Sequence, residues 1–294
     1  MGSRLKKRGI GLEVEALHRN VLQVHMPLGN RQGSEKWILL RSDAHHDSVS
    51  CNRVLEKAHL DEALARKAGV LDFGDLFDAM QGRGDKRSLK RDLRVDYGQT
   101  YFDDLVKDAA DFYEPYANNI LLLGEGNHET KVVEKYETRL THRLVGALND
   151  RTGAGIMAGG YTNWVRFCIR RSTERVGRVL HADHGRGAGG VGVNIHKMQR
   201  QRALFDADFY VSGHTHDAAH VPIVKHGITR NGTPYQRVCH LIKIPTYKDA
   251  YGDGHEGWDV EKTEPKPLGA WWLRFHWRGH RHGGVGVDVV FDGP

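Results

Sequence analysis

Histidine is unusually frequent in this sequence, with 19 among 294 residues. Five of the histidines lie, with Asp and Asn residues, in short polar clusters. Five such clusters occur along the chain, at residues 43–45, 74–78, 126–129, 184–185 and 213–216. Histidine binds transition metals and also titrates near neutral pH, so side chains of this kind can hold metal ions or transfer protons. Whether they do so here depends on whether the fold brings the clusters together.

Each polar cluster comes within a few residues after a short apolar run, and the fourth is part of the longer polar stretch His181-Ala182-Asp183-His184-Gly185. The runs, in chain order, read WILL, GVLDF, NILLL, RVL and DFYV. Continuous apolar runs of this length are typical of strands buried on both faces. Because ligand sites in open α/β sheets form outside the carboxyl ends of the strands, we expect the five clusters to converge.

Helical patterns lie between several of these runs. Apolar residues recur at helical spacing over 53–68, where Gly69 is predicted to end the helix, and over 129–149, which predicts a longer amphipathic helix. Strands that alternate with helices predict an α/β architecture.

The C-terminal part, residues 219–294, is β-rich. The segments with strand composition are 219–224, 236–245, 270–277 and 284–292, and Gly, Pro and charged turns separate them. We predict antiparallel strands that complete a second sheet, with residues 246–268 as a long loop.

The polar clusters, taken in order, resemble the motifs of the calcineurin-like metallophosphoesterases. They read Asp-x-His (43, 45), Gly-Asp-x-x-Asp (74–78), Gly-Asn-His-Glu (126–129), His-Gly (184–185) and Gly-His-x-His (213–216). The resemblance covers roughly residues 37–217. It implies a single domain over 1–294, built as an α/β fold of two stacked mixed β-sheets flanked by helices.

The resemblance also implies a dinuclear metal centre. Asp43, His45 and His216 would bind one ion, and Asn127, His184 and His214 the other, with Asp75 bridging the two. If the fourth motif is shifted in register, His181 would replace His184. Imidazole and carboxylate ligands together suit Mn, Fe, Zn or Co; Mn is the expected ion, and Ni or Mg are further alternatives.

The implied reaction is hydrolysis of a phosphate ester. Two ions about 3.5–4 Å apart can position the attacking oxygen and hold the phosphate. His128 matches the family's non-ligand histidine, which contacts the phosphate and protonates the leaving oxygen. We expect Glu129 at the start of the following helix, where a carboxylate is favoured by the helix dipole.

The substrate class is indicated by a basic insert at residues 79–100, next to the second motif. It contains Arg87, Lys90 and Arg91, and aromatic residues follow it at Tyr101 and Phe102. Basic and aromatic side chains suit a sugar-phosphate backbone and unstacked bases, so DNA or RNA is a candidate partner. A solvated loop without a partner is the competing interpretation. The net charge of +6 mildly favours an anionic partner.

Alternatives to a phosphodiesterase remain. Ser/Thr protein phosphatases usually continue the second motif with Asp-Arg-Gly, whereas here Ala79 follows Asp78. A phosphomonoesterase acting on a small molecule or phosphoprotein is therefore the second candidate. A non-catalytic scaffold that binds partner proteins is the third, although such relatives typically lose ligands that are all present here.

Other patterns are weaker. Residues 185–190 match Gly-x-Gly-x-x-Gly, but a loop beside the metals is favoured over a nucleotide site. His276, His280 and His282 are expected in an exposed turn. The three cysteines form no CxxC pair, and no apolar run approaches 18 residues, so we expect a cytoplasmic protein without a membrane span.

Overall fold

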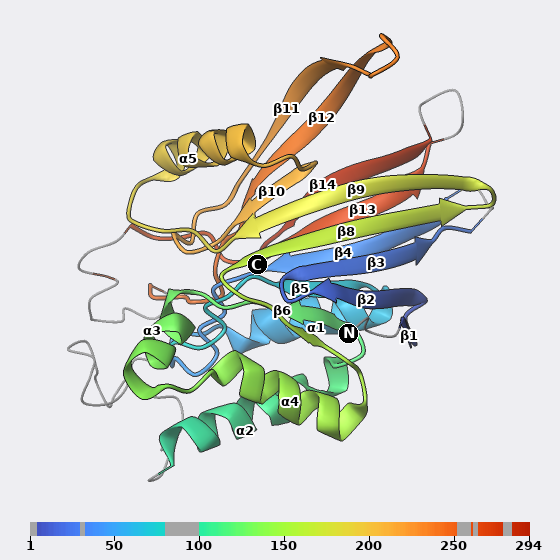
Figure 1. The fold of residues 1–294 in the computed structure, drawn as a ribbon. Coiled ribbons are helices and arrows are strands. Elements are labelled where there is room, and N and C mark those ends of the chain that lie inside the picture. Colours follow the sequence, from blue (N-terminus) through green and yellow to red (C-terminus); the bar gives the residue numbers. More distant parts are fainter. Residues whose placement is uncertain (1–4, 30–32, 80–99, 252–259, 261–263, 279–283) are drawn as a thin grey trace.

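Two mixed β-sheets stack face to face in the computed structural model, which describes residues 5–29, 33–79, 100–251, 260, 264–278 and 284–294. Helices α1 to α4 cover the outer face of one sheet, and α5 covers part of the outer face of the other (Figure 1). The predicted α/β architecture of two stacked mixed sheets flanked by helices is therefore confirmed. The basic insert lies outside the described residues apart from Ala79 and Thr100.

The six-stranded sheet carries the first three motifs. Its strands, in spatial order, are β14 (Val285–Asp292), β13 (Ala270–Trp277), β4 (Glu35–Arg41), β5 (Gly69–Asp72), β6 (Ile120–Leu123) and β7 (Met157–Ala158). Strands β4 to β7 run parallel, and β13 pairs antiparallel with β4. The motifs after β4, β5 and β6 consequently emerge at the same edge of the sheet.

The eight-stranded sheet carries the last two motifs. Its spatial order is β1 (Lys6–Arg8), β2 (Leu12–His18), β3 (Val21–Pro27), β8 (Thr162–Arg171), β9 (Glu174–Asp183), β10 (Phe209–Ser212), β12 (Pro234–Lys243) and β11 (Ala219–Ile228). Strand β10 runs parallel to β9 and to β12. Parallel pairing of β9 and β10 places the fourth and fifth motifs side by side.

Apolar side chains fill three layers between these elements. The central layer lies between the sheets and includes Leu40, Leu71, Phe167 and Phe209. A second layer lies under the helices α1 (Arg53–Ala65), α2 (Tyr101–Tyr113), α3 (Asn127–Tyr136) and α4 (Leu140–Thr152). A third, smaller layer lies beneath α5 (Val191–Leu204), where Met198 packs on β10 and β12. Four of the five apolar runs lie in strands buried almost throughout, as expected, whereas Arg178 and Val179 of the run in β9 are only partly buried.

Two helix predictions need correction. The first helix ends at Ala65, and Lys67, with φ of 53°, takes the left-handed position that was assigned to Gly69. Gly69 instead begins β5, where an added Cβ would lie 2.6 Å from a Leu121 methyl group. The single helix predicted over 129–149 is two helices, because the chain turns at Glu137, with φ of 54°.

The C-terminal strands were predicted to complete one sheet, and this is wrong. Strands β11 and β12 join the eight-stranded sheet, while β13 and β14 join the six-stranded sheet. Burial explains the division. Trp271, Trp272 and Leu273 are all buried, so β13 fits inside a sheet next to β4, whereas alternate residues of β11 are exposed, as suits an edge strand.

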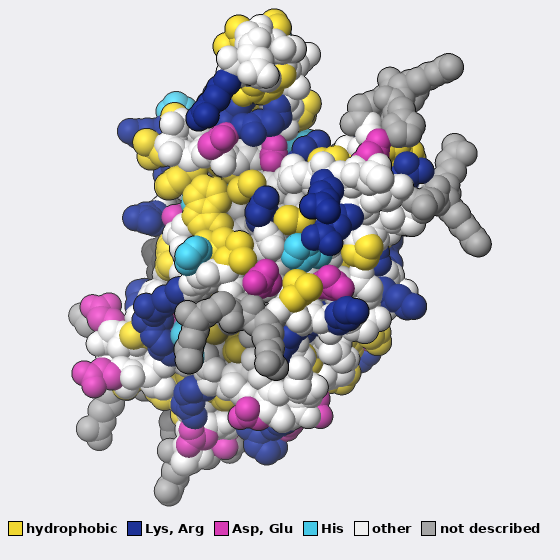
Figure 2. All heavy atoms as spheres, turned by 45° about the vertical axis from the view of Figure 1, so that its right-hand side comes forward, with side chains coloured by type: hydrophobic (Ala, Val, Ile, Leu, Met, Phe, Trp, Pro, Cys, Tyr) yellow, Lys and Arg dark blue, Asp and Glu magenta, His cyan; other side chains and the backbone are white. Residues whose placement is uncertain are grey.

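The surface shows charges of both signs. Lys and Arg side chains are interspersed with Asp and Glu on the face shown in Figure 2, around a patch of hydrophobic side chains. Among the described residues, no helix is both long and apolar enough to cross a membrane.

Candidate metal centre

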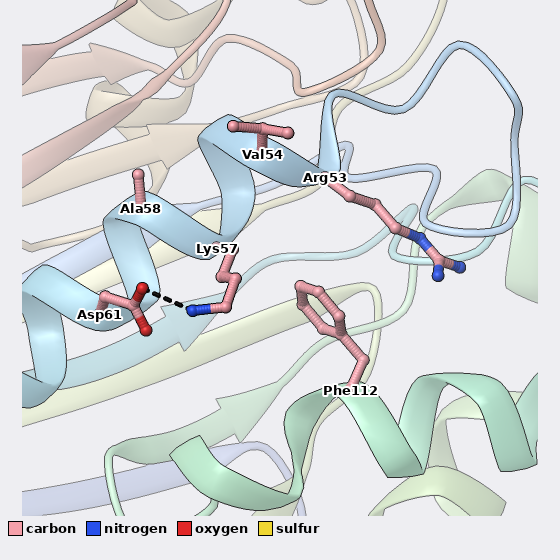
Figure 3. Close-up of a pocket in the computed structure, with 6 residues that line it drawn as sticks. All are labelled: Arg53, Val54, Lys57, Ala58, Asp61 and Phe112. Atoms are coloured by element: carbon pink, nitrogen blue, oxygen red, sulfur yellow. Dashed lines mark hydrogen bonds and ion pairs between the residues drawn. The ribbon is translucent and has the colours of Figure 1, made fainter.

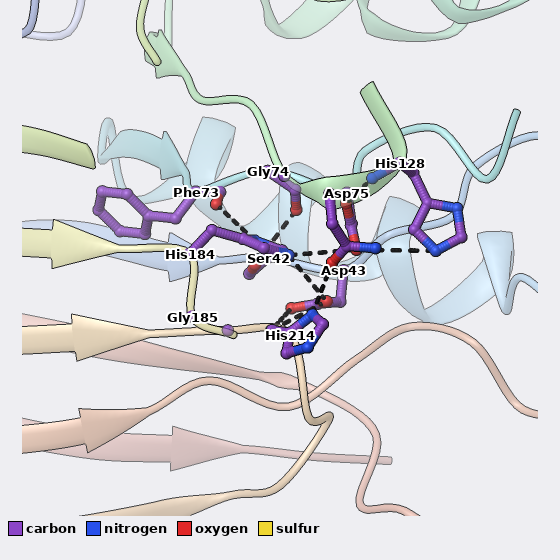
Figure 4. A network of polar contacts seen from close by, with 12 residues as sticks. Ser42, Asp43, Phe73, Gly74, Asp75, His128, His184, Gly185 and His214 are labelled. Atoms are coloured by element: carbon purple, nitrogen blue, oxygen red, sulfur yellow. Dashed lines mark hydrogen bonds and ion pairs between the residues drawn. The ribbon is translucent and has the colours of Figure 1, made fainter. Parts of the chain in front are cut away.

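The five motifs meet at one edge of the sandwich, where the two sheets face each other (Figure 4). Asp43, Asp75 and Asn127 follow β4, β5 and β6 of one sheet. His184 and His214 follow β9 and β10 of the other. Neither sheet alone holds all the predicted ligands, so the stacking of the sheets assembles the site.

The backbone of the site is strained. Nine non-glycine residues among those described have positive φ, and five of them are predicted ligands: Asp43, His45, Asp75, His214 and His216. Each such conformation costs of order 1–3 kcal/mol and persists only where the surroundings over-determine it. Positive φ is therefore concentrated in the loops that carry the predicted ligands.

A first cluster of donor atoms consists of Asp43, His45 and His216. The two Nε2 atoms of His45 and His216 lie 3.2 Å apart, and His216 Nε2 lies 3.4 Å from Asp43 Oδ1. Nδ1 of His45 is 2.7 Å from Asp78 Oδ1 and donates to that carboxylate, which leaves Nε2 as the ligand atom. Burial lowers the pKa of His45, so the neutral imidazole that a metal requires is favoured.

A second cluster consists of Asp75, His184 and His214. The Oδ1 of Asn127 lies 2.6 Å from Nδ1 of His214, so the predicted amide ligand adjoins this cluster. Burial lowers the pKa of His214 to about 4, which keeps its ring neutral. The structure thus places all seven predicted ligands near one another; Asp75, expected to bridge the two ions, groups with His184 and His214.

His184 gives the clearest sign of a cation. Its Nδ1 lies 3.0 Å from the Phe73 carbonyl and donates to it, so Nε2 points at the carboxylates of Asp75 (3.1 Å) and Asp43 (3.9 Å). This nitrogen is fully buried and forms no hydrogen bond. Burial opposes a charge on the ring, but Asp75 and Asp43 outweigh burial and raise the pKa of His184 to about 10. Positive charge between His184 Nε2 and the two carboxylates is therefore favoured, and either a proton or a metal ion can supply it.

The two carboxylates lie between the clusters. Asp43 Oδ1 is near both His184 and His216, and its oxygens also accept the backbone N–H of His214 at 2.9 and 3.1 Å. Asp75 Oδ1 accepts the backbone N–H of His128 at 2.8 Å. Its other oxygen, Oδ2, faces His184. The donor set, imidazole nitrogens with carboxylate and amide oxygens, fits two transition ions.

His128 lies in the first turn of α3 and, with His45 and Asp78, forms a third group of donor atoms that lie close together. Its Nδ1 lies 2.6 Å from the backbone carbonyl of Asp78 and donates to it, which directs Nε2 toward the site, 3.9 Å from Asp75 Oδ2. Its ring packs edge-on against His45 with centroids 4.9 Å apart. Burial opposes a charge on the ring, but Asp75 and Asp78 outweigh burial and raise the pKa of His128.

Glu129 lies in the first turn of α3, as expected. It also forms hydrogen bonds that connect two of the motifs. Its carboxylate accepts three backbone N–H groups, from Gly126 (2.8 Å), Asp75 (3.0 Å) and Phe77 (2.9 Å). Burial and the nearby Asp75 carboxylate raise the pKa of Glu129 to about 8. The residue ties the third motif to the second.

Sequence reasoning assigned no role to three aspartates that adjoin the ligands. Each pairs with a cation: Asp78 with Lys248 at 3.2 Å, Asp217 with Lys266 at 2.8 Å and Asp183 with Arg186 at 3.5 Å. Asp78 could have been found from the sequence, because it is the second Asp of the motif Gly-Asp-x-x-Asp. Lys248 and Lys266 belong to none of the five motifs, so the sequence alone did not indicate that they lie near the site.

The structure also shows where other residues singled out in the sequence lie. His181 lies away from the clusters and stacks on Phe205, with ring centroids 4.1 Å apart, so the cluster contains His184 rather than His181. Residues 185–190 form the loop between β9 and α5. His276 was expected in an exposed turn, but it lies on β13 and is partly buried. His280 and His282 lie outside the described residues, as do Arg87, Lys90 and Arg91.

A further His–Cys–Glu cluster and a surface pocket lie apart from this site. His46, Cys51 and Glu56 are buried together, but Glu56 Oε1 already bonds Arg41 at 2.7 Å, so a cation occupies that place. A cavity of about 470 Å³ opens between α1 and α2 (Figure 3). Its Lys57 bonds Asp61 at 2.7 Å, and its Arg53 bonds Asp108, so both of its cations are paired.

Comparison with other proteins finds likeness in structure only. No protein-family model matches the sequence, and no significantly similar sequence occurs among curated proteins. Among solved structures, three examples superpose over 87% of this chain.

These three structures are only distantly similar. A predicted phosphoesterase from Streptococcus pneumoniae is 11% identical, with 90% of its chain covered and a TM-score of 0.34. Vps29 from Entamoeba histolytica, complexed with Zn²⁺, is 12% identical, with 98% covered and a TM-score of 0.34. GAP50 of Plasmodium, described as the anchor in the inner membrane complex, is 9% identical, with 84% covered and a TM-score of 0.42. Superpositions this loose assign no function.

Proposed function

We propose that the protein is a hydrolase of phosphate esters that uses two divalent metal ions. Asp43, His45 and His216 would hold one ion. Asn127, His184 and His214 would hold the other, with Asp75 shared. The observation that carries the proposal is the buried Nε2 of His184, which faces two carboxylates without a hydrogen bond.

Ions bound there would supply Lewis acidity toward the phosphate and a bound water of lowered pKa. Mn is the expected ion, with Fe, Zn, Co, Ni or Mg as alternatives. Charge supports the binding of an anion. Asp43 and Asp75 contribute two negative charges, and Lys248 offsets that of Asp78. Two divalent ions would therefore leave the site positive, which favours a phosphate.

The chain's own residues have separable tasks in this proposal. The strained loops hold the ligand atoms in place before substrate arrives, which lowers the reorganisation needed for reaction. His128 would donate a proton from Nε2 to the leaving oxygen, because its Nδ1 is engaged by the Asp78 carbonyl.

A phosphodiester, in DNA, RNA or a nucleotide, is the favoured substrate. The support is the basic composition of the insert at 79–100, with Arg87, Lys90 and Arg91 close in sequence to Asp75. A phosphomonoester is the alternative within the same chemistry.

The first test is metal stoichiometry combined with activity. Metal-free protein would be loaded with each ion in turn, its metal content measured by elemental analysis, and its hydrolysis of a chromogenic diester and monoester compared. We expect two ions per chain. His184→Asn should lose one of them and Asp75→Ala should weaken both, with activity lost in each variant.

His142→Asn is the matched control, because His142 is exposed on α4. That variant should keep two ions and full activity. Wild-type protein that binds at most one ion, or a His184→Asn variant that retains both ions and full activity, would refute the proposal.

A further inference from the structure

Tyr161 lies where the chain crosses from one sheet to the other, beside the second cluster. It comes after β7, an edge strand of the six-stranded sheet, and directly precedes β8 of the eight-stranded sheet. The residue before it is tied to the third motif, because the backbone N–H of Glu125 donates to the Gly160 carbonyl at 3.1 Å. The backbone that carries Tyr161 is therefore fixed to the sheet that supplies Asn127.

Three contacts of Tyr161 surround His184, which belongs to the other sheet. The backbone N–H of His184 donates to the Tyr161 carbonyl at 3.0 Å. The Tyr161 hydroxyl donates to the carbonyl of Gly185, the next residue along the chain. The Tyr161 ring packs edge-to-face against the His184 imidazole, with centroids 5.4 Å apart. Tyr161 thus holds the backbone before and after His184 as well as its ring.

Gly185 has no side chain that restricts its backbone, so its hydrogen bonds matter for the position of His184. Its φ of 108° lies in the region that favours glycine, and a Cβ there would lie 2.8 Å from Ser212 Oγ. Its N–H donates to Asp183 Oδ1 at 3.0 Å, and its carbonyl accepts the Tyr161 hydroxyl. Loss of the hydroxyl would free one of these two attachments.

The direction of His184 Nε2 depends on this backbone. The ring is held at Nδ1 by the Phe73 carbonyl at 3.0 Å, and Nε2 faces Asp75 at 3.1 Å. A shift of the His184 backbone moves Nε2 relative to an ion bound between the sheets. Because distances from a metal to its ligands vary by only about 0.2 Å, a small shift is enough to weaken the bond.

We propose that Tyr161 is a positioning residue for the second ion, the one assigned to Asn127, His184 and His214. Its hydroxyl fixes the backbone of His184 through the Gly185 carbonyl and thereby sets the affinity of that metal position. The inference rests on the proposed function and adds to it a residue outside the five motifs. Among the described residues, the hydrogen bonds of Tyr161 reach no ligand of the first ion, so the effect should be confined to the second.

The test is calorimetric titration of Mn²⁺ into metal-free, full-length protein, with the number of bound ions checked by elemental analysis. The second position is identified as the one that His184→Asn loses. Tyr161→Phe removes the hydroxyl and keeps the ring and the backbone carbonyl. We expect this variant to bind the second ion about 10-fold more weakly, as is typical when a group that orients a metal ligand is lost, with the affinity for the first ion nearly unchanged.

Tyr210→Phe is the matched control. Tyr210 lies on β10 of the same sheet, and its hydroxyl also donates to a backbone carbonyl, that of Phe205 at 2.7 Å. It packs in the apolar layer beneath α5. The change should lower the melting temperature of the metal-free protein but leave both dissociation constants unchanged.

Unchanged affinity for the second ion in Tyr161→Phe overturns the inference. Equal weakening of both ions in that variant also overturns it, as does the same loss of metal affinity in Tyr210→Phe, since general loss of stability would then be the cause. Failure of the proposed function is distinguishable, because wild-type protein would then bind fewer than two ions before any variant is compared.

Discussion

The side chains of the site are arranged by charge as much as by shape. His184, Asp43 and Asp75 are all buried, and a buried charge is costly unless an opposite charge compensates it. At this point a ring nitrogen of His184 faces the two carboxylates without a hydrogen bond. A cation bound beside His184, as in the proposed function, would compensate the charge of the two carboxylates.

His128 provides the prediction at the scale of one residue. His128→Asn should lower kcat by about 10²–10⁴ on esters with poor leaving groups, because a general acid is typically worth that much. Esters of nitrophenol should be less affected, because nitrophenolate leaves without a proton. The measurement is kcat for a series of leaving groups, with metal content and melting temperature determined in parallel.

Two outcomes would contradict this role for His128. A variant that loses a metal ion would make His128 a ligand. Full activity on poor leaving groups would assign the proton transfer to another residue.

Secondary structure elements hold the ligand loops from several directions. Asn194, near the start of α5, contacts Thr215 Oγ1 at 2.9 Å and Asp217 Oδ2 at 2.8 Å. Lys266 holds the other oxygen of Asp217 at 2.8 Å. Thr215 lies between His214 and His216, so α5 and the C-terminal part of the chain together stabilise the strained loop that carries two predicted ligands.

Gly126 provides the prediction at the scale of elements. A Cβ at this position would overlap Oδ1 of Asp75 and lie 2.5 Å from its backbone nitrogen, so β5 and α3 can meet here only through glycine. We expect Gly126→Ala to lower the free energy of unfolding by about 1–3 kcal/mol, as for other overpacked sites. It should also weaken metal binding by displacing Asp75.

Gly146→Ala is the matched control. Gly146 lies within α4, with no atom inside 4 Å of an added Cβ, so this change should raise the free energy of unfolding by roughly 0.5–1 kcal/mol. Urea denaturation measures both values. Equal stability and metal affinity in Gly126→Ala and wild-type protein would show that the contact between the motifs is not tight.

At the scale of the whole molecule, two sheets stack around one site, and the surface carries charges of both signs. The face in Figure 2 interleaves basic and acidic side chains, so that face has no continuous basic surface. In the proposed function, recognition of a nucleic acid depends on the basic insert, which is close in sequence to Asp75.

Replacing Arg87, Lys90 and Arg91 together by Ala tests the insert at this scale. Binding to DNA or RNA should weaken, and its dependence on salt concentration should become shallower, because fewer counterions are released. Hydrolysis of a small chromogenic diester should stay near the wild-type rate. Fluorescence anisotropy over a range of salt concentrations measures the first effect. Equal losses on polymer and small diester would instead assign the insert a structural role.

The sequence by itself determined the five strands, the polar cluster after each and the α/β class, because apolar runs and the residues that follow them are local patterns. It also supplied all seven ligand candidates. Local patterns do not report where a chain bends, so the break at Glu137 and the division of the C-terminal strands between two sheets came only from the tertiary structure. The same holds for the contact of Asp78 with Lys248, which are 170 residues apart. Packing of the two sheets decides which distant residues meet, and no spacing along the chain encodes that.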